Sequence, residues 1–545
     1  MRTRPRAATM NQHPFHKTLG SSQPLSLIAL SEQRKRSNSV AEFYRTLDRV
    51  SVLGDGTNGH TGCVNALHWA NDGAILLSGS DDTTVCVWRT ETGEPIRHTL
   101  RCQDIVDTGH SWNIFSVKML PLSSNIVTAA GDGQVRVFDL LRSARTATHG
   151  SGSTKVSPLL ISRCHTGHAK RIAVEDSPSQ FLSAGEDGAV RQHDMRAPHQ
   201  CKIGCPAPLA RLPHPLSTLS NSLLAPHLFV TAGHSPYGYL FDRRHSGRFI
   251  KEEWGVPLNT NDFTTCVRRF GRKFRGWGES RGDEYITGAR MSSTSSHEVL
   301  LSYSSDAVYL YSTMDDATDT VELGNREYSD ENVPVYTFGE TMRPPPLFDE
   351  LLSNHLSTLA DFGVDVDDET MQTADATALL SHYLETTSEL DSNDEDAQSY
   401  EHSNSDVPIV LPRRRFAGSC NVETIKDVNF LGPNDEYVVS GSDDGNWFMW
   451  DKNSGELLNI LEGDGSIVNI IEGHPHLPVV ATSGIDSSIK LFAPVPGPSQ
   501  FSKIHQARRI ISRHSEAALE RLSLSRLLEV WGTRRISIPP EPEPE

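Results

Sequence analysis

The chain has 545 residues, and 69 acidic against 51 basic side chains give it a formal net charge of −18 at pH 7. Apolar residues make up 37 %, while the 40 glycines and 31 prolines are close to average usage, which excludes a fibrous or a wholly disordered protein. No apolar run approaches the roughly 18 residues needed to cross a bilayer, so we expect no membrane partner.

Residues 1–50 are predicted to form a flexible basic tail. The first 31 residues contain four basic and no acidic side chains, as organelle transit peptides do, but Pro5, Pro14 and Pro24 would interrupt an amphipathic helix. The basic run at 34–36 could be a nuclear address. Eight thinly spread cysteines are typical of a reducing compartment. We therefore expect the protein in the nucleus and the cytoplasm.

A repeat occupies residues 51–495. The segment 78–88 reads as a turn followed by an alternating strand that ends on an aromatic residue, and four further copies keep this order. Two degenerate copies, at 231–242 and 302–311, bring the number to seven. The five regular copies carry a turn aspartate six residues before the strand end, at Asp82, Asp132, Asp187, Asp444 and Asp486. Seven copies predict a closed, all-β ring without exposed sheet edges.

Gly-His pairs precede several copies, at His60, His110, His168 and His474. Gly-His, an aspartate turn and Trp-Asp are together the signature of the WD-repeat β-propeller. A buried histidine can donate to the turn aspartate, so we predict a structural network in the blades. Its expected members are His60, Asp82, His110, Asp132, His168, Asp444 and Asp486. A catalytic triad of Ser78, His60 and Asp82 is rejected because similar trios recur, so we expect no enzyme and no cofactor.

The repeats also resemble one family in detail. The segments GHTGCVNALHW at 59–69 and EDGAVRQHDMR at 186–196 are similar to the WD-repeat substrate receptors of cullin-4 ubiquitin ligases, in particular to the subgroup of the eighth cullin-4-associated factor. The resemblance covers most of residues 55–495. It implies a seven-bladed propeller that docks on the ligase adaptor protein and presents a protein substrate, unknown in identity, for ubiquitination.

In that family the adaptor-binding strand follows a turn aspartate and ends in Trp-Asp-x-Arg. The motif corresponds here to Asp187, Asp194 and Arg196, and a second, partial copy to Asp242 and Arg244. His193 stands where the family has tryptophan. An exposed arginine held by an aspartate can bind a carboxylate or cap a helix of a partner. The residues alone leave open that each pair is only structural, as in a WD-repeat scaffold of a nuclear chromatin or RNA-processing complex.

Two other clusters offer candidate sites. His199, Cys201 and Cys205, with His214 nearby, offer metal-ligating atoms, but their spacing lacks a Cys-x-x-Cys pair and no second pair follows. We therefore expect free thiols and no metal. Five basic and three aromatic side chains alternate over 268–277, a pattern that can bind nucleic acid. We favour a solvated blade loop and expect no nucleic-acid partner.

Two segments fall outside the repeat. Residues 341–406 hold 16 acidic and one basic side chain, which accounts for −15 of the net charge of −18. They are predicted to be a disordered insertion between the fifth and sixth blades. Within residues 496–545, a basic amphipathic helix is predicted before a disordered tail. Its expected apolar face consists of Ile504, Ala507, Ile511, His514, Ala518, Leu522 and Leu528.

Overall fold

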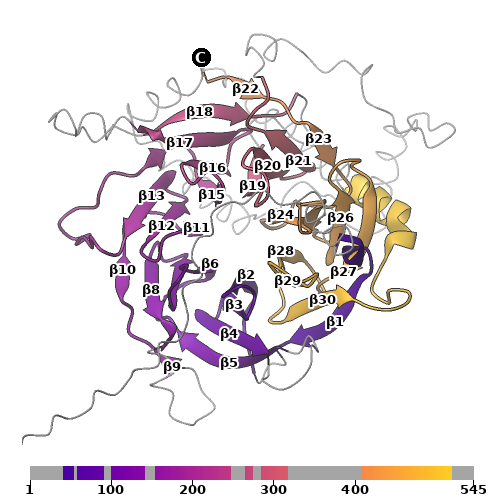
Figure 1. The fold of residues 1–545 in the computed structure, drawn as a ribbon, viewed down its shortest axis with the longest axis horizontal. Coiled ribbons are helices and arrows are strands. Elements are labelled where there is room, and N and C mark those ends of the chain that lie inside the picture. Colours follow the sequence, from indigo (N-terminus) through magenta and orange to yellow (C-terminus); the bar gives the residue numbers. More distant parts are fainter. Residues whose placement is uncertain are drawn as a thin grey trace, which may run out of the picture. The chain divides into compact units, whose positions relative to one another are not determined.

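A computed structural model describes residues 41–54, 58–90, 100–141, 154–246, 264–273, 284–316 and 407–517. The strands within these ranges form seven sheets of four or five strands each, and the sheets follow one another around a ring (Figure 1). The predicted all-β, seven-bladed propeller is therefore confirmed. Among the described residues, no helix combines the length and apolar character that a bilayer span requires.

The first three blades follow one another along the chain. Blade 1 contains β2 (Val64–Ala70), β3 (Ile75–Ser80), β4 (Thr84–Thr90), β5 (Leu100–Asp107) and the short parallel strand β9 (Thr154–Lys155). Blade 2 contains β6 (Ile114–Met119), β7 (Asn125–Ala130), β8 (Val135–Asp139) and β10 (Leu160–Ser162). Blade 3 contains β11 (Ala169–Val174), β12 (Gln180–Gly185), β13 (Ala189–Asp194) and β14 (Ala210–Arg211).

The other four blades complete the ring. Blade 4 contains β15 (Leu216–Asn221), β16 (Leu228–Gly233), β17 (Gly238–Ser246), β18 (Thr264–Phe270) and β22 (Ile409–Val410). Blade 5 contains β19 (Ile286–Met291), β20 (Glu298–Tyr303), β21 (Val308–Ser312) and β23 (Arg414–Phe416). Blade 6 contains β24 (Val428–Leu431), β25 (Tyr437–Gly441), β26 (Asn446–Asp451) and β27 (Leu457–Glu462). Blade 7 contains β28 (Val468–Gly473), β29 (Val480–Gly484), β30 (Ile489–Pro494) and β1 (Leu47–Leu53).

The core lies between blades. Each of seven buried apolar clusters combines side chains of two neighbouring blades, so that every interface around the ring has its own layer. Because the middle strands are covered on both faces, they are buried at successive residues; all six positions of β3 and all five of β21 are buried. The turn aspartates found in the sequence lie between the second and third strands of their blades. The repeat signal comes from this turn and from the strand that directly follows it.

Ring closure joins the two ends of the propeller. Strand β1 pairs antiparallel with β30, from Leu47 opposite Pro494 to Leu53 opposite Ile489. Residues 41–44 are helical, and Tyr44 packs against Tyr437 of blade 6 with ring centroids 5.8 Å apart. The propeller therefore begins before residue 51, and the last ten residues of the predicted tail are part of it. Residues 1–40 lie outside the described residues.

The acidic insertion interrupts a blade. Residues 341–406 fall between β21 and β23, the third and fourth strands of blade 5, and not between the fifth and sixth blades as predicted. The error arose because the repeat pattern marks the turn between the second and third strands and carries no signal for the outer strand. The predicted disorder of the insertion lies outside the described residues.

The chain leaves blade 7 and returns to blade 6. The 3-10 turn η3 (Ile504–Gln506) leads into a helix over residues 507–517. Ile510 is fully buried in the cluster between blades 5 and 6, and Ala507 and Ile511 pack at its edge. The predicted helix is confirmed over this range, although its most buried residue, Ile510, was not in the predicted face. The rest of the predicted apolar face, Ala518, Leu522 and Leu528, and the predicted disordered tail lie outside the described residues.

Candidate functional site

A series of hydrogen-bonded side chains lies within blade 1. Trp88 Nε1 donates to Ser78 Oγ over 2.8 Å, and the same hydroxyl lies 2.7 Å from His60 Nε2. His60 Nδ1 lies 3.1 Å from the Asp82 carboxylate. Only one proton order satisfies all four groups: indole to hydroxyl, hydroxyl to Nε2, and Nδ1–H to carboxylate. Burial opposes ionisation of Asp82, but its bond from His60 and two backbone N–H groups hold the pKa of its carboxyl below the ordinary value.

Blades 2 and 3 contain the same series of hydrogen bonds between a histidine, a hydroxyl group and the turn aspartate. His110 lies 3.0 Å from Asp132 and 2.8 Å from the Thr128 hydroxyl. In blade 3 the histidine is His165, 2.8 Å from Asp187 and 2.7 Å from Ser183 Oγ. The network has therefore the predicted members in blades 1 and 2.

The prediction of His168 for blade 3 is wrong. His168 pairs with Glu186 at 2.9 Å, and its side chain is 38 % exposed. The buried histidine precedes its aspartate by 22 residues in all three blades, whereas the Gly-His pair at 167–168 lies closer to Asp187. The constant spacing, rather than the Gly-His pair, was the signal in the sequence.

The last two blades use other partners for their turn aspartates. Asp444 in blade 6 is bound by His514 of the C-terminal helix, whose Nε2 lies 3.1 Å away and whose Nδ1 lies 2.8 Å from the Gly418 carbonyl oxygen. Asp486 in blade 7 pairs with Lys490. Both aspartates thus bind partners within the fold, but neither is bound by a Gly-His histidine.

The His514 contact predicts a pH dependence. Although burial lowers the pKa of His514, its bond to Asp444 raises it above the ordinary value, while the pKa of Asp444 falls to about 2. A raised folded-state pKa stabilises the folded chain fully below the unfolded pKa of about 6.5, and this increment is lost as pH rises through the folded pKa. We expect His514→Gln to lower the thermal unfolding midpoint more at pH 5.5 than at pH 8.5. An equal loss at both pH values would contradict the contact.

His193 fills the place of the expected tryptophan. Its ring stacks on Phe181, with centroids 4.8 Å apart, and its Nε2 lies 2.8 Å from Ser183 Oγ. That distance equals the Trp88 bond to Ser78 in blade 1. Burial lowers the pKa of His193 to about 3, so the ring is neutral and its Nε2–H can donate as an indole N–H does. The departure from the family motif thus leaves the third strand of blade 3 held in the same way.

Arg196 is fixed just beyond this strand. Asp194 is the last residue of β13 that pairs with β12, and its carboxylate accepts the Arg196 backbone N–H at 2.9 Å. The same carboxylate accepts Nε at 3.0 Å and Nη2 at 2.7 Å, while Gln180 donates to it from β12. The Arg196 side chain is nevertheless 68 % exposed. The guanidinium is therefore held in one orientation while its other N–H groups remain open to solvent.

Arg244 repeats this arrangement in blade 4. The Asp242 carboxylate accepts the Arg244 backbone N–H at 2.9 Å, Nε at 3.0 Å and Nη2 at 2.6 Å. The Arg244 side chain is 67 % exposed. Asp242, like Asp194, is the last residue of the third strand paired with the second. Since the two motifs occupy the same position in consecutive blades, at the end of the pairing between the second and third strands, both arginines lie on one rim of the ring.

Among the described residues, an aspartate that holds the arginine two positions after it occurs in these two blades, whereas the exposed pair of Asp315 and Arg413 in blade 5 joins residues far apart in the sequence. In blade 2 Asp139 forms the same turn, accepting the backbone N–H of Leu141 at 3.0 Å, and Leu141 stands at the position of the arginine. Met314 and Asn453 stand at the corresponding positions of blades 5 and 6. An arginine occurs at this position in the adjacent blades 3 and 4 but not in blades 2, 5 and 6. It is therefore not required by the repeat itself.

The residue between Asp242 and Arg244 ties the two blades together. Arg243 donates Nη1 to Glu175 Oε2 over 3.0 Å and makes a second bond with Nη2. Glu175 directly follows β11 of blade 3, and both side chains are largely buried. This bidentate pair fixes blade 3 against blade 4 and hence the spacing of the two exposed arginines. Sequence reasoning missed it, because nothing in the repeat relates residue 175 to residue 243.

Asp187 does not belong to this rim. It lies before the start of β13, at the opposite end of the strand from Arg196, and its side chain is 6 % exposed. Its carboxylate binds His165, which opposes the effect of burial and lowers its pKa. The predicted set therefore separates into four rim residues and one buried aspartate that positions the strand.

Two cations of the basic and aromatic segment, Arg269 and Arg272, pack against aromatic rings of the propeller. Arg269 lies over the ring of Tyr237, and Arg272 lies 3.9 Å from the ring centroid of Tyr303. Arg272 also pairs with the buried carboxylate of Asp306 at 2.5 Å. These two cations serve packing within and between blades, and residues 274–277 lie outside the described residues.

Ion pairs join strands of three different blades. Glu472 of β28 lies 3.0 Å from Arg290 of β19 and 3.5 Å from Lys118 of β6. Burial raises the pKa of Glu472, but these two cations outweigh it and lower the pKa to about 2. The carboxylate is therefore ionised and engaged, which makes it a poor proton donor for catalysis.

Comparison with known proteins finds similarity to WD-repeat proteins, in agreement with the repeats in the sequence. Residues 52–89, 101–139 and 412–451 match the family described as WD domain, G-beta repeat. The chain is 24 % identical to the WD repeat protein iqw1 of Schizosaccharomyces pombe, over 84 % of this chain and 89 % of that protein. It is 26 % identical to the human WD and tetratricopeptide repeats protein 1, over 86 % and 87 %. A mouse protein named DDB1- and CUL4-associated factor 6 is 28 % identical over 54 % of this chain and 31 % of its own length.

Proposed function

We propose that this WD-repeat β-propeller protein is a substrate-recognition subunit of a cullin-4 RING ubiquitin ligase. The observation that carries the proposal is the pair of aspartate-held, exposed arginines, Arg196 and Arg244, on adjacent blades. They are the proposed contacts with the ligase adaptor. The name of the partial mouse relative supports this role, and WD-repeat propellers typically act as scaffolds without catalysis.

The geometry suits recognition for an energetic reason. A free arginine side chain loses rotamer entropy when it binds, whereas Asp194 and Asp242 already hold these two in place. Each guanidinium keeps donors for a carbonyl or carboxylate of the partner. Arginine is also among the residues that dominate binding energy at interfaces. Two guanidinium groups held in fixed orientations on one rim therefore define a docking surface for one protein.

The protein's contribution to ubiquitination would be proximity. The adaptor-bound propeller would hold a target protein on its remaining surface while the catalytic partners of the ligase act on it. A nuclear and cytoplasmic location would agree with such a role.

The second candidate function is a scaffold in a nuclear chromatin or RNA-processing complex. In that case the aspartate–arginine pairs would only stabilise the rim, and exposed pairs of this kind contribute little to folding stability. Affinity capture of the full chain from cells separates the two functions. Recovery of the cullin-4 adaptor supports the ligase function, and recovery of chromatin or RNA-processing subunits without the adaptor supports the scaffold.

The histidine in the motif yields a further prediction. We expect His193→Phe to keep the stack on Phe181 and to lose only the bond to Ser183, at a cost of about 1 kcal/mol in unfolding free energy. Blade 2 already has a buried phenylalanine, Phe138, at the corresponding position. Adaptor affinity, measured with purified proteins, should change less than about threefold, since Asp194 holds Arg196 without His193. A tenfold loss in a folded variant would show that the ring at residue 193 is itself part of the interface.

A further inference from the structure

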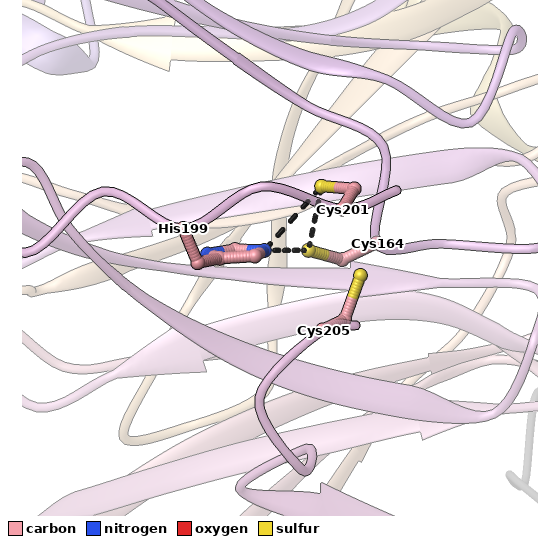
Figure 2. A group of neighbouring side chains, drawn as sticks. All are labelled: Cys164, His199, Cys201 and Cys205. Carbon is pink, nitrogen blue, oxygen red and sulfur yellow. Dashed lines mark hydrogen bonds between the residues drawn. The ribbon is translucent and has the colours of Figure 1, made fainter. Parts of the chain in front are cut away.

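Four side chains that can bind a metal converge between blades 2 and 3. Cys164 follows β10, the outer strand of blade 2, and is buried. His199, Cys201 and Cys205 come from the loop between β13 and β14 of blade 3, and Figure 2 shows all four side chains directed toward a common centre. Their ligand atoms all lie within 4.8 Å of one another, and no other such group occurs in the described part of the chain.

The sulfur–sulfur distance fits a tetrahedral zinc site, and the nitrogen–sulfur distances are somewhat shorter than in such a site. Zn–S bonds of about 2.3 Å and Zn–N bonds of about 2.0 Å place tetrahedral ligands roughly 3.5 to 3.8 Å apart. The sulfurs of Cys164 and Cys201 are 3.7 Å apart. His199 Nε2 lies 3.0 Å from the Cys164 sulfur and 3.3 Å from the Cys201 sulfur. Three sulfurs and one imidazole nitrogen form a common donor set of structural zinc sites.

The surroundings favour thiolate ligands over a disulfide. A disulfide needs sulfurs about 2.05 Å apart, far closer than those of Cys164 and Cys201. The Arg163 backbone N–H donates to the Cys201 sulfur at 3.3 Å, and the Ser162 hydroxyl donates to the Cys164 sulfur at 3.1 Å. Such donors stabilise negative charge on sulfur and orient it, as the partners of metal ligands do.

The fold at this place lacks the usual strand pairing. The outer strand β10 has three residues and β14 has two, whereas β5, the outer strand of blade 1, has eight. The chain from residue 195 to residue 209 therefore crosses the outside of blade 3 with little support from a sheet. A metal bound to Cys164 would join this loop to blade 2 and replace the missing ladder.

We propose that Cys164, His199, Cys201 and Cys205 bind one structural Zn²⁺ ion. Four protein ligands close the coordination shell, so the site is built for stability and leaves no position for a reacting water. The ion would anchor the loop that begins directly after Arg196. The expectation of free thiols considered only residues 199–214, whereas the structure adds Cys164, 35 positions before His199, to the group.

Metal analysis of the full-length protein tests this proposal. The protein is expressed with zinc in the medium, purified without chelator, and its zinc is measured by plasma mass spectrometry. We expect one zinc per chain, and at least a tenfold lower content in Cys164→Ser and Cys201→Ser. Cys63→Ser, which changes a half-buried thiol of blade 1, is the matched control and should keep the metal. Replacement by Co²⁺ should give the absorption of a tetrahedral thiolate complex.

The wild-type measurements decide the proposal even if a ligand variant does not fold. Wild-type protein without zinc that also fails to bind added Zn²⁺ or Co²⁺ would overturn it, as would a Cys164–Cys201 disulfide in freshly purified protein. Equal zinc content in the folded ligand variants and the control would assign the metal to another place and would also overturn it. None of these readouts depends on adaptor binding, so the proposal stands or falls apart from the ligase function.

Discussion

Replacing Arg196 and Arg244 together by alanine is expected to lower the affinity of the chain for the cullin-4 adaptor at least 100-fold. A buried interface arginine contributes on the order of 2 kcal/mol, a factor of roughly 30, and two such contacts on one rim exceed the effect of either alone. Each single variant should lose about 10-fold or more. Affinities are measured by calorimetric titration of the purified adaptor into the purified full-length chain.

Three controls make this result specific. Arg211→Ala removes an exposed arginine from β14, which pairs with the opposite end of β13, and should leave the affinity unchanged. Arg196→Lys keeps the charge but loses the two-pronged bond to Asp194, so it should resemble Arg196→Ala. The unfolding midpoint of the double variant should stay close to that of the wild type, because exposed pairs add little stability. A folded double variant that binds as tightly as the wild type would leave the pairs with a structural role only.

His165→Ala is expected to lower the free energy of unfolding by about 3 kcal/mol. The substitution leaves the Asp187 carboxylate, 6 % exposed, without its histidine and removes the acceptor of the Ser183 hydroxyl. Because the interaction with His165 is the main effect that lowers the pKa of Asp187 against burial, the substitution leaves the cost of burying this carboxyl group largely uncompensated. Urea denaturation at pH 7 measures the loss.

His168→Ala is the matched control for that experiment. Its side chain is 38 % exposed and paired with Glu186 at the surface, so the expected change in unfolding free energy is within about 0.5 kcal/mol. If His168→Ala were instead the more damaging of the two, the Gly-His pair would mark the structural histidine after all. The comparison thus tests which feature of the repeat, the dipeptide or the spacing, determines the blade.

The number and order of blades could be predicted from the sequence because their signal is local. The turn aspartate, the third strand and its aromatic end lie within a dozen residues, as from Asp82 to Trp88. The outer strands could not be predicted in the same way. In blade 7 the outer strand β1 comes from the N-terminal side, and in blade 5 the outer strand β23 follows the acidic insertion. Such pairings depend on ring closure rather than on neighbouring residues.

The candidate sites show the same difference between local and long-range signals in the sequence. Asp194 and Arg196 are two residues apart, as are Asp242 and Arg244, so the motif could be found and its internal hydrogen bonds expected. The ion pair of Arg243 with Glu175 joins blades 4 and 3, and the contact of Cys164, the fourth proposed zinc ligand, with His199 joins blades 2 and 3. Neither belongs to the repeat period, and only the fold brings their partners together.

Titration of the purified wild-type chain with the purified cullin-4 adaptor tests the central claim most directly. The proposed function predicts a one-to-one complex with a dissociation constant of about 1 μM or below, as two fixed arginine contacts within an interface of ordinary size would give. The complex should be lost in the Arg196→Ala/Arg244→Ala variant. Absence of binding at concentrations of about 50 μM, with the chain folded, would contradict the ligase function.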